Sequence, residues 1–481
     1  MTTTHTLEHD VTQHRKSLFV GSLVALSLAL TACGGTSGPE QTIDTTKNAE
    51  ATKVTLSFTS NAILGGKNEA EAQWYQDYII PEFTKQQKAK GIDVTLTFEP
   101  NGVDDEKYKT KLALDLQSKS GADVIGMDGI WVGEFAEAGY IKPLTDVAGA
   151  DVDSWEGWDQ MSEAVQQAAA FDGKRYGIPQ GADGRVLYYN KTLFEKAGLP
   201  ADWAPASWDD ILAAARALKA AGVSVPIQLN AGTAMGEATT MQGLLPLLVG
   251  TGTKVWEDGK WMGNSQGLRD ALTLYKTIYV DEGLGDPVLQ QETAGRDKSF
   301  SEFASSDVGI LIESDYLWRS VINPDSGTAP MPDRDSVVGY TKIPAQTPGS
   351  GVDGQDFVSM SGGAARVLNP NTEFPQQAWE LLAFINSKEA FQNRVASSPI
   401  ITPRADVNQI VLKDNPMLNF VATEVLPITA YRPGLAEYPE VSLALQEATA
   451  QVVAGTSVDD AAAAYQTAVE KIVGSENVAS S

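Results

Sequence analysis

The 481-residue chain is almost without histidine and cysteine, and the few that it has lie in its first 33 residues. They are His5, His9, His14 and Cys33. The rest of the chain therefore has no imidazole for a Ser-His-Asp or Cys-His catalytic arrangement. It also has no thiolate or imidazole to bind zinc, and no cysteine pair for a disulfide. We expect neither such catalysis nor a bound metal or other cofactor.

The sequence also lacks the motifs of nucleotide-binding and calcium-binding loops. It contains no GxxxxGK[ST] loop, and no GxGxxG fingerprint between a predicted strand and a predicted helix. A step that hydrolyses nucleotide would therefore belong to a partner chain. The acidic cluster of Asp151, Asp153 and Glu156 lacks the order of ligands in an EF-hand loop, so we interpret it as solvated.

Positive charge is scarce relative to negative charge. The chain has 36 Lys and Arg against 62 Asp and Glu, a formal net charge of −26. Such an acidic chain is repelled by nucleic acids and by anionic membrane surfaces, so we expect neither as a direct partner. Its length is sufficient for two or more domains, each with its own core.

The amino terminus has the pattern of a bacterial lipoprotein signal. A basic pair precedes the apolar segment Ser17–Ala29, which is too short to span a bilayer. Leu30–Cys33 (LTAC) then matches a lipobox, so we predict removal of residues 1–32 and acylation of Cys33. Lipid chains on this cysteine would supply the two anchors that stable attachment needs. Residues 33–53 would form a flexible tether to the outer face of the cell membrane.

From residue 54 onward, segments with the two-residue apolar period of a strand alternate with segments that have the 3.6-residue period of a helix. Strands are predicted at Val54–Thr59, Ile92–Glu99, Ala122–Met127, Val225–Leu229 and Val308–Glu313. Helices are predicted at Glu69–Lys88, Lys107–Ser120, Trp208–Ala221, Ser265–Glu282, Pro375–Ile385, Leu443–Ala454 and Val458–Ile472. This alternation predicts an α/β fold with a mostly parallel, doubly wound sheet. Gly327–Gly354, rich in Pro, Gly and Asp, is predicted to be a long irregular connection.

The segment Lys174–Pro200 reads as a strand end, a polar turn, an aromatic strand and a short helix. This order suits either a surface loop or a chain that crosses between two lobes. The segment contains Tyr-Gly-Ile-Pro, Leu-Tyr-Tyr-Asn-Lys and Leu-Phe-Glu-Lys-Ala-Gly-Leu-Pro, and Ser-Trp-Asp-Asp follows at Ser207–Asp210. Together these motifs resemble the extracellular solute-binding proteins of bacterial sugar-importing ABC transporters.

That resemblance implies an α/β, two-lobed periplasmic-binding-protein-like fold with discontinuous lobes and a hinge cleft. One lobe would then contain residues 54–180 and 356–398, and the other residues 186–350 and 400–474. It also implies a monomeric binding protein rather than an enzyme. Such a protein captures a carbohydrate, a di- or oligosaccharide, and delivers it to the permease subunits of an ABC transporter.

Two other functions stay open on the residues alone. A membrane-anchored glycoside hydrolase needs only two carboxylates, and acidic residues are plentiful. A binding protein for a non-sugar ligand such as a polyamine would suit the acidic balance, and its binding would be sensitive to salt.

Ligands of open α/β sheets bind beyond the carboxyl ends of the strands, where sugars need aromatic faces and polar side chains. Asp128 ends a predicted strand and Trp131 follows it, similar to the family's Asp-x-x-Trp. They would contact ligand, or else cap a helix and fill the core. In the polar turn, Asp183 and Arg185 would share ligand hydroxyls or pair with each other. Asn61, after the first strand, is a further candidate.

Glu313 ends the strand predicted at Val308–Glu313, and Tyr316 and Trp318 follow it. Either aromatic ring could stack on a sugar, with the other serving as packing, and Glu313 is either a hydroxyl acceptor or a buried structural acid. Gly362 and Gly363 match the family's Gly-Gly, where backbone N–H groups stay free for ligand, although a strand bulge would also explain them.

The last candidate is Arg432, in Tyr-Arg-Pro, which resembles the family's carboxyl-terminal Arg-Pro segment. Its planar fork suits adjacent sugar hydroxyls, while a surface arginine is the simpler alternative.

Overall fold

The computed structural model describes residues 43–103, 105–396 and 399–479. The predicted signal peptide, Cys33 and residues 34–42 of the predicted tether lie outside these residues. The prediction of a flexible tether was wrong for the remainder, because Lys47 pairs with Glu373, and Gln376 and Gln377 donate to backbone carbonyls of residues 45 and 48. Residues from Ile43 onward form one compact unit. Within the described part of the chain, no helix has the length and apolar character needed to cross a membrane.

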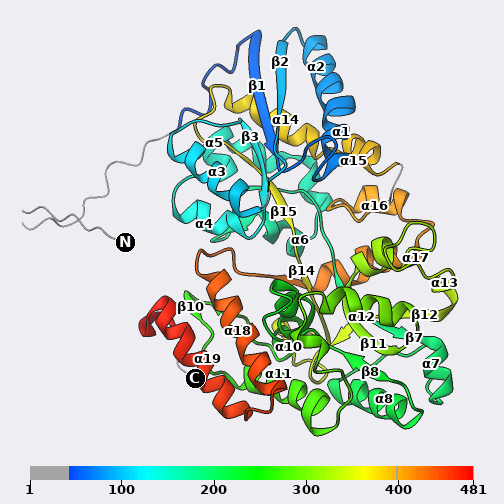
Figure 1. Ribbon diagram of the computed structural model, residues 1–481. Coiled ribbons are helices and arrows are strands. Elements are labelled where there is room, and N and C mark those ends of the chain that lie inside the picture. Colours follow the sequence, from blue (N-terminus) through cyan, green and yellow to red (C-terminus); the bar gives the residue numbers. More distant parts are fainter. Residues whose placement is uncertain (1–42, 104, 397–398, 480–481) are drawn as a thin grey trace, which may run out of the picture. The chain divides into compact units, whose positions relative to one another are not determined.

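The first lobe is built on a five-stranded sheet in the order β2-β1-β3-β15-β6 (Figure 1). Its strands are β1 (Lys53–Ser60), β2 (Asp93–Pro100), β3 (Val124–Asp128), β6 (Gly177–Pro179) and β15 (Ala364–Leu368). β1 is parallel to β2 and to β3, whereas β15 is antiparallel to β3 and to β6. A strand from late in the sequence therefore joins β3 to β6.

Helices cover this sheet, and its core lies between them. They are α1 (Glu69–Trp74), α2 (Ile80–Ala89), α3 (Asp105–Gln117), α4 (Trp131–Glu137), α5 (Leu144–Ala148), α6 (Glu163–Gln166), α14 (Pro375–Ile385) and α15 (Lys388–Val395). A π-helical turn, Tyr75–Ile79, joins α1 to α2 just before Pro81. In β1 and β2, alternate residues are buried, as expected of strands with one face on a core.

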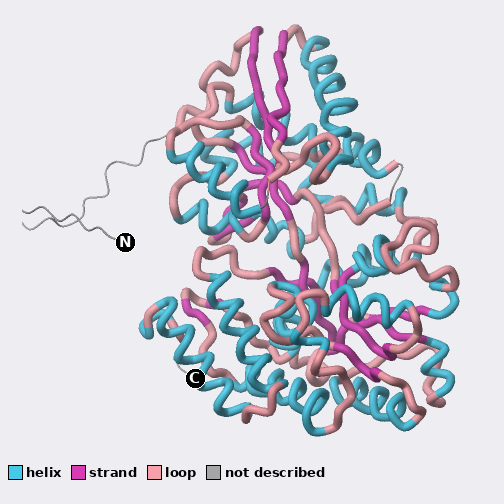
Figure 2. The backbone as a smooth tube through the Cα atoms, viewed as in Figure 1, coloured by secondary structure: helices cyan, strands magenta, loops and turns pink. Residues whose placement is uncertain are grey.

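The second lobe is built on a four-stranded sheet in the order β12-β7-β11-β8. Its strands are β7 (Arg185–Asn190), β8 (Val225–Gln228), β11 (Val308–Ser314) and β12 (Val338–Thr341). β11 is parallel to β8 and antiparallel to β7, and β7 is antiparallel to β12. In Figure 2 the strands of each sheet lie at the centre of their lobe, with helices around them.

Helices surround the sheet of the second lobe. They are α7 (Lys191–Lys196), α8 (Trp208–Ala220), α9 (Glu237–Thr239), α10 (Leu245–Gly250), α11 (Gln266–Lys276), α12 (Gly295–Ala304), α13 (Arg334–Val337), α16 (Ala405–Val411), α17 (Pro416–Phe420), α18 (Tyr438–Val453) and α19 (Val458–Val473). At α8, the Ser207 hydroxyl accepts the backbone N–H of Asp210, and Gly222 has a φ of +78° just beyond the end.

The prediction of a mostly parallel sheet is confirmed for β1, β2 and β3 but was wrong for the complete sheets. Both sheets are mixed, because periodicity reveals burial but not strand direction. The irregular connection predicted at Gly327–Gly354 in fact contains β12. Gly339 lies within that strand, and a Cβ there would lie 2.1 Å from the ring of Tyr189. Gly339 contributed to the prediction of an irregular connection, yet its lack of a side chain is what lets β12 pair with β7.

Within the described residues, the chain passes between the lobes at three places. Residues 180–184 join β6 to β7, and Gly362 and Gly363 join β14 (Phe357–Ser361) to β15. β14 pairs with β13 (Ile343–Pro344) and β16 (Thr429–Tyr431), and its Val358 and Met360 pack in the core of the second lobe. The third passage follows α15 and leads to α17.

Candidate functional site

The first two passages are joined by Asp183. Its Oδ1 accepts hydrogen bonds from the Gly362 N–H at 2.7 Å and from the Ser361 hydroxyl at 3.2 Å. Arg185 donates to the same oxygen from Nη1 at 2.9 Å. The sequence predicted both residues as ligand contacts or as a mutual pair, and the structure pairs them.

The guanidinium of Arg185 is held within the protein. The residue is 5% exposed, and its Nε donates to Gln242 at 2.9 Å. Its Nη1 also donates to the carbonyl of Met360 at 3.2 Å. Arg185 thus orients Asp183, whose partly exposed carboxylate is the polar group that this pair presents at the boundary between lobes.

A second carboxylate, Asp315, supports the same turn from the second lobe. It accepts the N–H of Gly184 at 3.3 Å and the Nε of Arg319 at 2.9 Å. Burial raises the pKa of Asp315 to about 6, and the negative charge of Asp183 adds to the rise. Arg319 opposes it.

At the end of β3, Asp128 accepts the backbone N–H of Ile130 at 3.1 Å, just before α4 begins. Burial raises the pKa of Asp128, while the charge of Arg432 opposes the rise. Trp131 is 5% exposed and packs against Tyr108, with ring centroids 6.3 Å apart. The structure therefore places Trp131 in the core of the first lobe and leaves Asp128 at the lobe boundary.

Arg432 is nearly buried and is paired with Glu237, a residue that the sequence did not point to. Arg432 Nη1 donates to Glu237 Oε1 at 3.1 Å. Tyr438 donates to the same oxygen at 2.7 Å, and Ser442 donates to Oε2 at 2.5 Å. Among the described residues, Arg432 Nε is buried without a hydrogen-bond partner. A guanidinium held by its tip, with Nε unsatisfied, suits an acceptor that is supplied from outside.

The two aromatic candidates after β11 have different environments. Tyr316 is 38% exposed, while Trp318 is 5% exposed and lies edge-on to Tyr340, with ring centroids 5.6 Å apart. The guanidinium carbon of Arg334 lies over the ring of Trp318, 3.9 Å from the ring centroid. Of the two rings, Tyr316 is the one open to a ligand.

Glu313 is a structural acid. It is 1% exposed, and both of its oxygens accept from Arg296, at 2.7 and 2.9 Å. Of the two roles open to it on the sequence, the structure supports the buried ion pair.

Asn61 and the paired glycines lie at strand ends. Asn61 donates to the carbonyl of Val103 and to Asp105, each at 3.0 Å, and leaves its buried Oδ1 without a partner among the described residues. The Gly363 carbonyl accepts the N–H of Gly129 at 2.8 Å. The Asn61 contacts tie the end of β1 to the start of α3, and the Gly129–Gly363 contact ties the end of β3 to the start of β15.

A small cavity lies where these segments meet. It has a volume of about 40 Å³. Its walls come from both lobes: Gly129, Ile130, Gly133, Gln167, Ala168, Ala170, Ser361, Gly362, Gly363, Tyr431, Arg432 and Gly434. A Cβ built on Gly362 would lie 3.6 Å from Asp183 Oδ1 and 4.0 Å from Arg432 Nη2, so these three residues converge.

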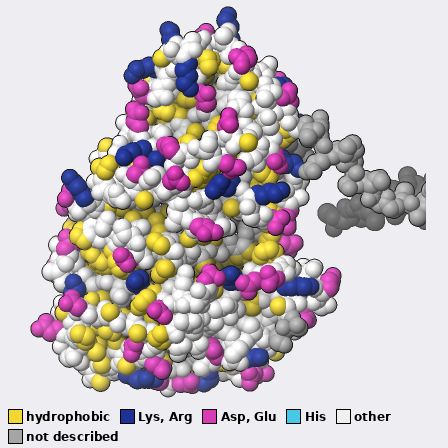
Figure 3. Space-filling model, turned by 180° about the vertical axis from the view of Figure 1, so that it is seen from behind, with side chains coloured by type: hydrophobic (Ala, Val, Ile, Leu, Met, Phe, Trp, Pro, Cys, Tyr) yellow, Lys and Arg dark blue, Asp and Glu magenta, His cyan; other side chains and the backbone are white. Residues whose placement is uncertain are grey.

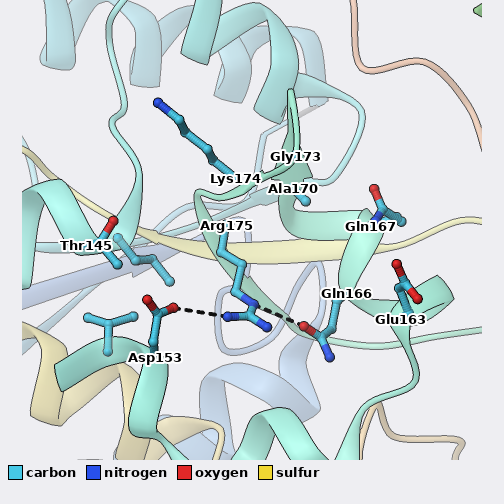
Figure 4. Close-up of a pocket in the computed structure, with 11 residues that line it drawn as sticks. Thr145, Asp153, Glu163, Gln166, Gln167, Ala170, Gly173, Lys174 and Arg175 are labelled. Carbon is cyan, nitrogen blue, oxygen red and sulfur yellow. Dashed lines mark hydrogen bonds and ion pairs between the residues drawn. The ribbon is translucent and has the colours of Figure 1, made fainter. Parts of the chain in front are cut away.

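Another polar cavity, of about 390 Å³, lies in the first lobe and shares Gln167 and Ala170 with the small cavity (Figure 4). Its central cation, Arg175, donates to Asp153 and to Gln166, both at 3.0 Å, and lies over the ring of Trp158 at 4.5 Å.

Charge elsewhere is dispersed. Figure 3 shows acidic side chains interspersed with basic ones over one face of the molecule. Among the described residues, no group of His, Cys, Asp and Glu is arranged to hold a metal ion.

The family model of bacterial extracellular solute-binding proteins matches residues 66–390, more than half of the chain. The chain belongs to this family. The resemblance found in the motifs is thereby confirmed. A binding protein of Brucella abortus is 27% identical to this solute-binding protein over 384 residues, 79% of this chain and 86% of the other.

Two further relatives match shorter segments. UgpB of Agrobacterium fabrum, an sn-glycerol-3-phosphate-binding periplasmic protein, is 27% identical over 189 residues, 37% of this chain and 41% of its own. The diacetylchitobiose binding protein DasA of Streptomyces coelicolor is 26% identical over 188 residues, 38% of this chain and 39% of its own.

Solved structures confirm the two-lobed fold. The sugar-binding protein MalE of Xanthomonas citri superposes with a TM-score of 0.69 at 18% identity, covering 88% of this chain and 98% of that chain. The cyclic alpha-maltosyl-1,6-maltose binding protein of Arthrobacter globiformis gives 0.67 at 19% identity, covering 88% and 99%.

Proposed function

We propose that this solute-binding protein captures a di- or oligosaccharide between its lobes and delivers it to the permease subunits of an ABC transporter. The observation that carries the proposal is the convergence of Asp183, Gly362 and Arg432 at the lobe boundary. A carboxylate acceptor, a glycine backbone and a guanidinium with an unpartnered Nε donor suit hydroxyl groups, which both donate and accept. Asp128 and the exposed ring of Tyr316 would complete the polar and stacking contacts.

The names of relatives support a sugar. MalE and DasA are named for binding a sugar and diacetylchitobiose, while UgpB is named for a phosphorylated polyol. A phosphorylated polyol therefore belongs in the ligand panel beside the sugars.

Capture would require the lobes to move. A cavity of about 40 Å³ holds roughly one water molecule, whose share of liquid volume is about 30 Å³. It shares Tyr431, Arg432 and Gly434 with a cleft of about 1090 Å³ that residues of both lobes line, and this cleft has room for a disaccharide. Residues 180–184 and Gly362 would then flex as hinges when the lobes close on the ligand. We place the lobes at 54–180 plus 362–398 and at 186–361 plus 400–474, because Val358 and Met360 pack in the second core.

The lipid anchor is part of the proposal. Cys33 would be acylated after removal of residues 1–32, and the monomeric body would stay at the outer face of the membrane. Replacing Cys33 with serine should release the protein from the membrane fraction without changing its binding. Retention of the C33S variant in that fraction would refute the anchor.

The test of binding uses residues 34–481 without lipid. We would titrate mono-, di- and oligosaccharides, glycerol 3-phosphate and spermidine, following tryptophan fluorescence and thermal melting, and then recover the ligand. Saturable binding of one sugar class, recovered intact, supports the proposal. Cleaved sugar would indicate a glycoside hydrolase instead, and binding of spermidine alone, or of nothing in the panel, would overturn the assignment.

A further inference from the structure

The carboxylate of Glu71, on α1, is a buried group that the proposed binding contacts do not use. Glu71 is 8% exposed, and all of its partners are side chains. The partners are Ser60 Oγ at 3.1 Å, Gln180 Nε2 at 2.8 Å, Arg394 Nη2 at 3.3 Å, Arg366 Nη2 at 3.7 Å and the hydroxyl of Tyr75. So many partners on one carboxylate join segments that are far apart in the sequence.

Three of these partners lie where the chain leaves or enters the first lobe. Gln180 is the residue after β6, at the start of the first passage. Arg366 is on β15, which follows Gly363 in the second passage, and Arg394 is one residue before the end of α15, which leads to the third. One carboxylate therefore binds the first-lobe end of every passage between the lobes.

The same helix is fastened to the loop after β1. Ser60, which donates to Glu71, is the last residue of β1 and precedes the candidate ligand residue Asn61. Asn68, which caps α1, donates from its side chain to the carbonyl of Asn61 at 2.9 Å. A displacement of Asn61 by ligand would thus be transmitted to Glu71 through Ser60 and through Asn68 of the same helix.

Two arginine side chains keep the buried carboxylate of Glu71 ionised. Burial opposes ionisation of Glu71, but the guanidinium groups of Arg394 and Arg366 prevail and lower its pKa. Arg366 is 1% exposed and also donates to Asn386 at 2.8 Å and to the Tyr75 hydroxyl at 3.1 Å. Without the Glu71 charge, Arg366 and Arg394 would lose the counter-charge that they share.

We propose that Glu71 is a positioning residue. It fixes the first-lobe ends of the three passages relative to one another, and so couples ligand contact at the first lobe to closure of the lobes. The inference rests on the proposed function, since it concerns the response to ligand. A merely structural acid would contribute to stability alone. A coupling residue would also change how far the lobes close when ligand binds.

The matched control is Asp123, another largely buried acid of the first lobe. It accepts the backbone N–H of Ser57 at 2.8 Å and the hydroxyl of Thr372 at 2.5 Å. It precedes β3, at the end of the strand opposite to Asp128, and its hydrogen bonds join no passage. Asp123→Asn should therefore lower the melting temperature without altering closure.

The experiment compares wild type, Glu71→Gln and Asp123→Asn, using the sugar that wild type binds. Small-angle scattering with and without ligand measures compaction, and titration gives Kd. We expect Glu71→Gln to lose at least half of the ligand-induced compaction and to weaken binding about tenfold, while Asp123→Asn keeps both. Wild-type compaction and Kd in Glu71→Gln would overturn the inference.

A second variant covers the case in which Glu71→Gln does not fold. Gln180→Met removes only the hydrogen bond to the first passage and leaves the ion pairs intact. We expect a smaller loss of compaction, and an unchanged response would overturn the inference. If wild type itself neither binds nor compacts with any ligand in the panel, the proposed function fails, which is distinct from failure at Glu71.

Discussion

Gly133 on α4 and Gly434, which follows β16, bring the backbones of the two lobes into contact. A Cβ added to Gly133 would lie 2.1 Å from the Gly434 carbonyl oxygen, and one added to Gly434 would lie 3.2 Å from the Gly133 nitrogen. Since real Cβ atoms do not approach so closely, this contact depends on the absence of a side chain at Gly133. The lobes meet here beside Arg432 and the small cavity.

Gly133→Ala should therefore act as a wedge between the lobes. Overpacking of this kind costs about 1–3 kcal/mol, which exceeds the gain of about 0.5–1 kcal/mol expected for alanine in a helix. We expect weaker ligand binding, a larger radius of gyration in the presence of ligand, and a lower melting temperature. Gly250→Ala on α10 is the control, because the nearest atom to its added Cβ lies at an ordinary 3.5 Å and the residue is outside the passages. Equal behaviour of the two variants would mean that the contact does not limit closure.

Asp183→Asn tests the acceptor that joins the first two passages. The amide keeps the shape but loses the charge that faces Arg185 at 2.9 Å. Hydrogen bonds to charged groups contribute about 1.5–3 kcal/mol, so we expect Kd for the sugar to rise about tenfold or more. The control is Asp153→Asn, which removes an exposed partner of Arg175 in the first lobe. A titration in which D183N and D153N bind equally well would exclude Asp183 from the site.

Much of the fold could be predicted because local signals agreed with tertiary structure. The helix predicted at Trp208–Ala221 is α8, and the strand predicted at Val308–Glu313 is β11. Strand direction and β12 could not be predicted, because pairing partners are distant in sequence. The Gly339 that allows β12 to approach Tyr189 resembles a loop residue in a local pattern.

The site was harder to predict. Whether a side chain near a strand end contacts ligand or packs in the core depends on its burial, which the local sequence does not reveal. Trp131, Glu313 and Trp318 lie near strand ends, as expected, yet each is 5% exposed or less. Glu237 was missed because no motif surrounds it. Its role becomes visible only when α18 brings Tyr438 and Ser442, about 200 residues later, to its carboxylate.

A pair of aromatic variants should separate binding from stability after β11. Tyr316→Ala removes an exposed ring, so we expect a large loss of sugar affinity with little change in unfolding. Trp318→Ala removes a ring that is 5% exposed and should lower the free energy of unfolding by about 3–5 kcal/mol. Denaturant unfolding and ligand titration of both variants check this. The reverse pattern, with binding lost at Trp318 in a stable protein, would assign the stacking ring to Trp318.

The buried carboxyl of Asp315 should give the protein a pH-dependent stability. Its pKa in the folded state is raised from 3.8 to about 6, chiefly by burial, so the folded state binds this proton more tightly than the unfolded state does. The stabilising contribution is therefore complete below pH 3.8 and is lost as the pH rises through about 6. Asp183 and Arg319 face the same group, and both remain in an Asp315→Asn variant. Because the amide does not titrate, the stability of wild type relative to D315N should fall between these two pH values and stay level above them. Thermal unfolding of both proteins from pH 3.5 to 8 measures this difference, and a difference that rises over that interval would show that the carboxyl is held ionised by Arg319.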